Sequence, residues 1–587
     1  MNVSERFRGQ EPSSLSQLRR PIQSVIEFCP KGNPEIRPSR KWPWRSRSKL
    51  EPAELMLRTL YALSFCAFSL GLVGTIAAQS GQAPANIPTI RVTSRLVFLD
   101  VTVLDKKGHP VVTGLTKDDF VITEEKRPQR IFSFEEPNVH VADSALSEDN
   151  PSGKAPLTIF VLDLLNSGFA DSAYIRYSIR KYLMAQPAPL HSPAELMVLG
   201  NQSLEMAQGY TRSKEDLLSA LDHVPAALPY KFMNGAFFAE RFGQSIDALQ
   251  QIALQNKGLP GRKNIVWVGH GGPNILTGVL VGPVVDELNQ YVRDTTNMLV
   301  DSRMSLFVIY PGLKVSGPAQ TFSEGSAVAD IGDNDPFAGD INFGVFVNET
   351  GGKLFYNRND VNREIERSEE LGSEYYTLTY QPEGGIADGK FRRIRVTMRD
   401  PGLNALTKAG YFAPDQRAPV DPRQQTMVSL DEAAQAPIPF QALDLTIEGV
   451  VRHPDTRTAA FTVVLKHRNI DWDESTNGKS TANLALAAMS FSGGGDILAS
   501  KRETLTVTVN TQDPTRLAAT RTNLPVLIQL PPKTRNVRIA VQTVEGGRIG
   551  TAELDRKTID AAPEAPTPPP KLQPRFQGPQ APAPAVN

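Results

Sequence analysis

The pattern of apolar and polar positions changes several times along the chain and divides it into regions. Between residues 90 and 136 the run Val97–Val103 is rich in β-forming residues and Arg130–Phe134 alternates, and both patterns predict β-strands. From residue 157 the pattern changes to continuous apolar runs separated by stretches with helical spacing. Such runs are typical of strands that are buried on both faces and joined by helices. The region 157–373 is therefore predicted to be a three-layer α/β domain.

The α/β region opens with Leu157–Ser167, whose apolar run leads into Asp163. Apolar residues at helical spacing follow it, beginning with Ile175, Ile179 and Leu183. A short antiparallel strand is expected near Leu204–Gln208. The other predicted strands of this region are Glu195–Gly200, Asn264–Gly269, Ser305–Tyr310 and Lys353–Tyr356. Ligand groups of α/β sheets usually lie at the carboxyl ends of such strands, which makes Asp163 a candidate site residue.

Strand patterns return after the α/β region. We predict that 90–136 and 374–413 pack together into one β-sandwich with the α/β domain inserted in it, because each segment alone is too small to bury a face. Residues 414–438 contain prolines and are expected to be a linker. Alternation with regular turn signals over 440–556 predicts a C-terminal β-sandwich. The tail 561–587 is rich in Pro and Ala, which predicts disorder or polyproline II structure.

The N-terminal region contains an export signal or an anchor. Residues 1–54 have no apolar periodicity and are expected to be a disordered basic leader, although Met56 is an alternative start. Within 55–79, the run Leu60–Ala78 is uncharged, follows positive residues and ends in small residues. It fits a cleaved signal peptide, and it is also just long enough to span a membrane. In both cases the positive-inside rule predicts that the remainder is exported to the periplasm or the cell exterior.

Composition and motifs exclude several function classes. Lys plus Arg equals Asp plus Glu, 63 each, so no overall field favours nucleic acid. Cys29 and Cys66 both precede the expected cleavage point, so the mature chain would have no disulfide, cysteine-bound zinc or cysteine nucleophile. No nucleophile elbow, His-Glu-x-x-His pair, Walker loop or Rossmann glycine pattern is present, and the seven histidines are scattered.

Four short stretches together carry a family resemblance. They are Gly114–Phe120, Gly261–Trp267, Glu349–Gly352 and Gly410–Pro414. In this order, and around the α/β pattern, they resemble the exported family related to von Willebrand factor A (VWFA) domains that is described from acidobacterial genomes. The resemblance covers about residues 90–414. It implies a VWFA-like fold and export, and no established activity.

Functional VWFA domains have a metal-ion-dependent adhesion site, and the resemblance implies where its ligands would lie. Its first loop reads Asp-x-Ser-x-Ser, a second loop supplies a threonine and a third an aspartate. Here Asp163 and Ser167 match the first loop, but Leu165 replaces a serine ligand. Gly269 and His270 stand where the aspartate is expected, and 226–235 shows no threonine.

One carboxylate and one hydroxyl make a poor Mg²⁺ site, so we expect this site to be degenerate and no metal or cofactor to be bound. In the favoured interpretation Asp163 caps a helix or bonds loop amides. An atypical site for Mg²⁺, Mn²⁺ or Ca²⁺ at Asp163 and Ser167 is the alternative. Asn166, His270 and an acidic loop with Asp330, Asp333 and Asp335 are expected at the ligand-binding rim of the sheet.

Three function classes follow from this sequence. The first is a non-enzymatic, exported module that binds an unknown protein or envelope component. It would not bind nucleic acid, and it would contact the membrane only through an N-terminal anchor. The second is an envelope-associated hydrolase with a dispersed site, which requires a cleft with convergent carboxylates or a Ser/His pair. The third is a purely structural envelope protein with no ligand site.

Overall fold

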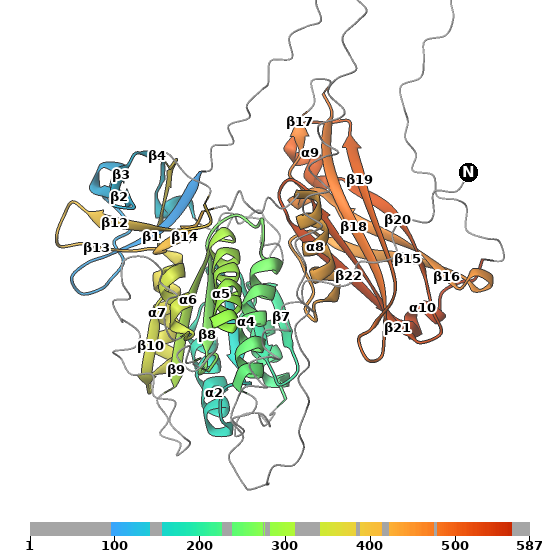
Figure 1. Cartoon of the computed structure of the whole chain (residues 1–587), viewed down its shortest axis with the longest axis horizontal. Coiled ribbons are helices and arrows are strands. Elements are labelled where there is room, and N and C mark those ends of the chain that lie inside the picture. Colours follow the sequence, from blue (N-terminus) through green and yellow to red (C-terminus); the bar gives the residue numbers. More distant parts are fainter. Residues whose placement is uncertain are drawn as a thin grey trace, which may run out of the picture. The chain divides into compact units, whose positions relative to one another are not determined.

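The computed structural model describes residues 96–140, 155–225, 238–273, 275, 282–311, 341–382, 388–413, 422–474 and 478–565 (Figure 1). The leader 1–54, the apolar segment 60–78, the loop 226–235, the acidic residues Asp330, Asp333 and Asp335, and the tail beyond 565 lie outside these residues. No helix within the described ranges is long and apolar enough to cross a membrane.

A mixed six-stranded sheet forms the α/β region. Its strand order is β10-β9-β8-β5-β6-β7, with β5 parallel to β6 and β8, and β7 antiparallel to β6. The strands are β5 (Leu157–Asp163), β6 (Ala194–Leu199), β7 (Leu204–Thr211), β8 (Lys263–Val268), β9 (Met304–Pro311) and β10 (Leu354–Arg358). Every residue of β5, β6, β8 and β9 is buried, which explains their continuous apolar runs.

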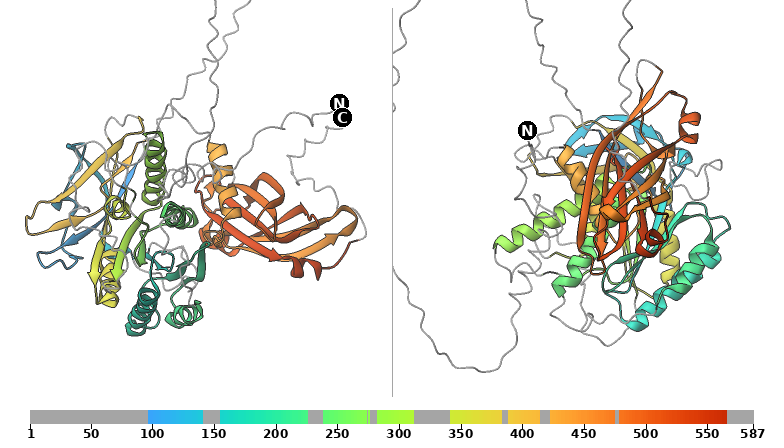
Figure 2. Two further views of the ribbon diagram at one scale, coloured as in Figure 1. Left: turned by 60° about the horizontal axis from the view of Figure 1, so that its bottom comes forward. Right: turned by 90° about the vertical axis from the view of Figure 1, so that its right-hand side faces the viewer.

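Helices cover both faces of this sheet (Figures 1 and 2). They are α2 (Phe169–Ala185), α3 (Lys214–His223), α4 (Phe238–Gln255), α5 (Gly282–Asp301), α6 (Gly344–Thr350) and α7 (Val361–Ser373). Along β5, Ile159 and Val161 pack in one core with α4, α5 and α6, whereas Phe160 and Leu162 pack in a second core with α2, α3 and α7. Because alternate side chains of β5 point to opposite faces of the sheet, this strand packs against the helices of both outer layers.

Two four-stranded antiparallel sheets combine strands from before and after the α/β region. Their orders are β13-β1-β11-β4 and β14-β12-β2-β3. The strands are β1 (Val97–Leu104), β2 (Phe120–Glu124), β3 (Arg127–Gln129), β4 (Ile131–Glu135), β11 (Tyr376–Tyr380), β12 (Phe391–Met398), β13 (Asn404–Leu406) and β14 (Gly410–Phe412). Leu99, Ile122, Leu378 and Val396 lie in one shared core, so each segment supplies the apolar face that the other lacks.

A buried network of charges joins these sheets to the α/β region. Arg303, just before β9, donates Nε to Asp100 Oδ2 of β1 at 3.1 Å and Nη2 to Asp100 Oδ1. Arg262, just before β8, is 1% exposed and donates Nη1 to Thr102 Oγ1 at 2.9 Å. Burial alone would raise the pKa of Asp100, but the charge and hydrogen bonds of Arg303 lower it to about 2.

The C-terminal region has two further antiparallel sheets around one core. One has the order β15-β16-β20, and the other has the order β17-β18-β21-β22 with β19 also paired to β18. The strands are β15 (Leu445–His453), β16 (Thr458–Lys466), β17 (Asp473–Glu474), β18 (Ser480–Ser492), β19 (Ile497–Val509), β20 (Arg521–Gln529), β21 (Thr534–Thr543) and β22 (Ile549–Asp555). The predicted combination of α/β and antiparallel β regions is therefore confirmed. The VWFA-like arrangement of these regions stays a prediction from the family resemblance.

The segment 414–438 differs from the predicted linker, because it contains helix α8 (Pro422–Gln435). Leu430 and Ala434 of α8 pack against Ala485 and Met489 of β18. This contact explains why β18 is apolar on both faces. Two short helices, α9 (Pro514–Ala519) and α10 (Arg556–Asp560), complete the region.

The Asp100–Arg303 pair predicts a pH-dependent contribution to stability. Asp100→Asn should lower the free energy of unfolding at neutral pH by about 2 kcal/mol, because it removes the partner of a guanidinium group that is only 24% exposed. Since the folded pKa lies below the usual 3.8, this stabilisation is present above pH 3.8 and is lost as pH falls toward 2. Urea denaturation of both proteins at pH 7 and at pH 3 measures the effect.

The exposed pair Glu448–Arg521 offers a control, because its two side chains are 49% and 62% exposed. Glu448→Gln should change stability at neutral pH by less than about 1 kcal/mol. Equal losses in the two variants would contradict the assigned role of Asp100.

Candidate functional site

The first loop after β5 is a compact turn built around Asp163. The backbone N–H of Asn166 donates to Asp163 Oδ1 at 3.0 Å, which closes a turn three residues after the carboxylate. Helix α2 begins two residues after Ser167. The turn therefore places Asp163, Asn166 and Ser167 at the carboxyl edge of the sheet, beside the start of a helix.

The Asp163 carboxylate is completely buried and accepts hydrogen bonds on both oxygens. Oδ2 accepts from Trp267 Nε1 of β8 at 3.0 Å and from the Gly271 backbone N–H at 2.9 Å. The side-chain amide of Asn166 donates Nδ2 to both Asp163 oxygens at 3.2 Å. Four donor groups from three segments thus surround a single carboxylate. Burial is the largest influence on Asp163 and raises its pKa, while these donors oppose the rise.

Two positions of the expected adhesion site are occupied by structural groups. Leu165 is 0% exposed and lies in the core shared with Trp267, so its side chain fills space where a serine would bind a metal. Gly269 has φ +149°, and a Cβ on it would lie 2.5 Å from Asp163 Cβ and 3.0 Å from Ser167 Oγ. The third loop therefore passes too close to Asp163 for an aspartate at position 269.

The residues present do not fit a Mg²⁺ ion of the adhesion-site type. N–H donors occupy the Asp163 oxygens that would face the ion. Among the described residues, no group of three or more His, Cys, Asp or Glu side chains could hold a metal. The hydroxyl of Ser167 is buried and has no hydrogen-bond partner among the residues that the structure describes. A single hydroxyl does not make a site for a hard cation.

His270 pairs with an acidic residue of α2. Its Nε2 lies 3.2 Å from Asp171 Oδ2, and its ring meets the Tyr310 ring edge-on with centroids 4.0 Å apart. The His270 side chain is 20% exposed and that of Asp171 is 6% exposed, so the pair lies at the surface of the edge with its carboxylate inside. His270 thus links the third loop to α2.

Asp163, Asn166, Ser167 and His270 lie at one edge of the sheet. Their positions at the carboxyl ends of β5 and β8 predict this placement. The predicted rim residues Asp330, Asp333 and Asp335 lie outside the described residues. Sequence reasoning did not identify Trp267, Gly271 and Asp171 as partners. The glycine-rich run Gly269–Gly272 was the only available signal, since it allows backbone N–H groups to approach a buried acid.

No family model and no curated protein matches the chain. Among solved structures, the VWA domain of SpRpn10 is 14% identical, with 37% of this chain and 96% of that chain covered and a TM-score of 0.21. The pilus adhesin SpaC from Lactobacillus rhamnosus GG is 7% identical, with a TM-score of 0.23. The match covers 68% of this chain and about half, 54%, of the adhesin. Neither likeness carries an argument about function.

Adding a single methyl group at position 269 tests the close approach of Gly269 to Asp163. Gly269→Ala should lower the free energy of unfolding by about 2–4 kcal/mol, because the new Cβ overlaps Asp163 and an L-residue is strained at this φ. Gly282→Ala at the start of α5 is a matched control, since its Cβ would meet nothing within 4 Å. The control should change stability by less than about 1 kcal/mol. A tolerated Gly269→Ala would mean that the two loops are not in contact as described.

Proposed function

We propose that this protein is an exported, non-enzymatic binding module with a VWFA-like α/β domain. It would bind a protein or envelope component at the carboxyl edge of the central sheet, and it would do so without a metal. The apolar run Leu60–Ala78 supports export, either as a signal peptide or as an anchor.

The observation that carries this proposal is the hydrogen bonding of Asp163. In an adhesion site of the metal type, a carboxylate is open toward the ion and the partner completes the coordination. Here Trp267, Gly271 and Asn166 donate to that carboxylate from inside the protein. A partner would therefore contact the edge through its surface side chains and not through a shared ion.

The edge offers an exposed aromatic residue for such a contact. Phe169 is the first residue of α2, two positions after Ser167, and it is 58% exposed. Large aromatic side chains at the surface are frequent anchors of protein interfaces. His270 lies on the same edge and adds a partly exposed polar group.

The hydrolase alternative has one observation in its favour. The Asp171–His270 pair involves the loop whose Gly269 closely approaches the buried hydroxyl of Ser167. An Asp–His pair next to a serine is the arrangement of a nucleophilic hydrolase when the histidine contacts the hydroxyl. No hydrogen bond between His270 and Ser167 occurs among the described residues, so binding is the better-supported function.

Photo-crosslinking at two ends of one helix tests the proposal. Phe169 and Met184 are replaced individually by benzoylphenylalanine in the full-length protein, and the protein is irradiated in its native cells. The two side chains are 58% and 62% exposed, and they lie at the first and the penultimate position of α2. We expect a discrete adduct from position 169 that persists in EDTA, and none from position 184.

Adducts of equal yield at both positions, or none at 169, would contradict binding at this edge. Loss of the adduct in EDTA would contradict a metal-independent contact. If the protein cleaved purified envelope polymers and His270→Ala abolished that cleavage, the hydrolase function would be favoured over the binding function.

A further inference from the structure

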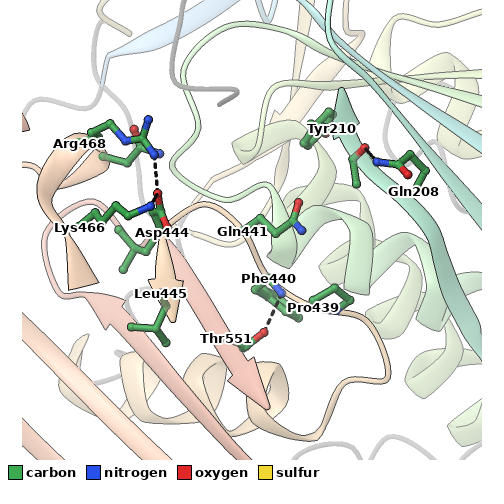
Figure 3. Close-up of a pocket in the computed structure, with 13 residues that line it drawn as sticks. Gln208, Tyr210, Pro439, Phe440, Gln441, Asp444, Leu445, Lys466, Arg468 and Thr551 are labelled. Carbon is green, nitrogen blue, oxygen red and sulfur yellow. Dashed lines mark hydrogen bonds and ion pairs between the residues drawn. The ribbon is translucent and has the colours of Figure 1, made fainter. Parts of the chain in front are cut away.

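A second candidate site lies away from the carboxyl edge, in a cleft beside strand β7 (Figure 3). The cleft has a volume of about 570 Å³. One wall is formed by Gln208, Gly209 and Tyr210 of β7. The other wall comes from the start of the C-terminal region and includes Gln441, Asp444, Lys466 and Arg468. Clefts of this size between two folded regions are common ligand sites.

The second wall has an excess of positive charge. Lys466 Nζ lies 3.1 Å and Arg468 Nη2 lies 2.5 Å from the same oxygen, Oδ2 of Asp444. Figure 3 shows both cations converging on this carboxylate. The remaining lining residues are neutral, so two cations face one anion in a chain whose total charge is zero. The Lys466 and Arg468 side chains are 45% and 32% exposed, and each has more donors than the one that Asp444 accepts.

The first wall is the edge of a sheet. Among the described strands β7 pairs with β6 alone, so its other edge has main-chain groups that the sheet does not use. Gln208, Gly209 and Tyr210 lie where the pairing of β7 with β6 changes register, between the paired residues Gln208 and Thr211. Gln208 Nε2 donates to Gly209 O at 3.3 Å, so this main-chain oxygen already has a partner. The other main-chain groups that the sheet does not use can bond an extended peptide.

Neutral hydrogen-bonding groups connect the two walls. Gln441 projects into the cleft between the charged cluster and β7 (Figure 3). A Cβ on Gly209 would lie 2.7 Å from Gln441 Oε1, so the absence of a side chain at Gly209 gives this amide its place beside the strand. The amides of Gln208 and Gln441 can donate to and accept from peptide groups.

We propose that this cleft binds an extended acidic peptide. The peptide would lie along the cleft beside β7 and present a carboxylate to Lys466 and Arg468, where it would compete with Asp444. A guanidinium and an ammonium group suit a carboxylate, and the edge of β7 suits a peptide main chain. This site is separate from the carboxyl edge of the central sheet, so it stands independently of the proposed function.

Fluorescence anisotropy with the full-length protein tests this site. The probe is a labelled, blocked peptide Thr-Val-Glu-Val-Glu-Val-Thr, and the comparison peptide has Gln in place of each Glu. We expect the acidic peptide to bind at least tenfold more tightly, with an affinity that falls as salt is added. Lys466→Met and Arg468→Met should each weaken binding several-fold. Asp444→Asn should strengthen it, because it releases both cations from their internal partner.

The opposite signs of these changes separate a binding role from a structural one, because damage to the fold would weaken binding in every variant. Lys501→Met and Glu503→Gln repeat the two charge changes in an ion pair on β19 that does not line the cleft. Both should leave affinity unchanged. Weaker binding in Asp444→Asn, equal binding of the two peptides, or no binding of either would overturn the proposal. Equally tight binding of acetylglutamate amide would overturn the peptide assignment.

Discussion

The buried carboxylate of Asp163 is the constraint around which the edge of the central sheet is arranged. A carboxylate without solvent is costly unless donors surround it, and here the indole of Trp267 and the backbone N–H groups of Gly271 and Asn166 supply them. These donors come from β8, from the third loop and from the first loop. Each must therefore be in position for the others to be satisfied. The same hydrogen bonds occupy the oxygens that a metal ion would need.

The stretches that carry the family resemblance serve the fold in a similar way. Thr116 N–H donates to Asp119 Oδ2 at 2.8 Å and closes a turn before β2. Arg262 connects β1 with β9 through Thr102 and Ser305. Leu306 N–H donates to Thr350 Oγ1 at 3.0 Å, which ties α6 to β9. Structural contacts thus account for conspicuous residues in three of the four stretches.

Much of the secondary structure could be predicted from the sequence, because buried apolar residues recur at the spacing of a helix or form the runs of a buried strand. The largely apolar runs of β5, β6, β8 and β9 follow from burial on both faces. Helix α8 was missed because the prolines around it favoured a linker, and its apolar residues are stabilised by contacts with β18 that only the tertiary structure supplies. The partners of Asp163 were missed for the same reason. Trp267 lies 104 residues away, and nothing local in the sequence directs its indole to that carboxylate.

The most direct test of the hydrogen-bonded carboxylate is the indole N–H signal of Trp267 in an NMR titration with Mn²⁺. The chain has four tryptophans, so the signal can be assigned with Trp267→Phe. The indole nitrogen lies 3.0 Å from Asp163 Oδ2, and a paramagnetic ion bound to that carboxylate would broaden its signal beyond detection. We predict that the Trp267 signal stays sharp when Mn²⁺ is added in excess over the protein. Selective loss of this signal at one equivalent of Mn²⁺, reversed by EDTA, would show that Asp163 binds a metal after all.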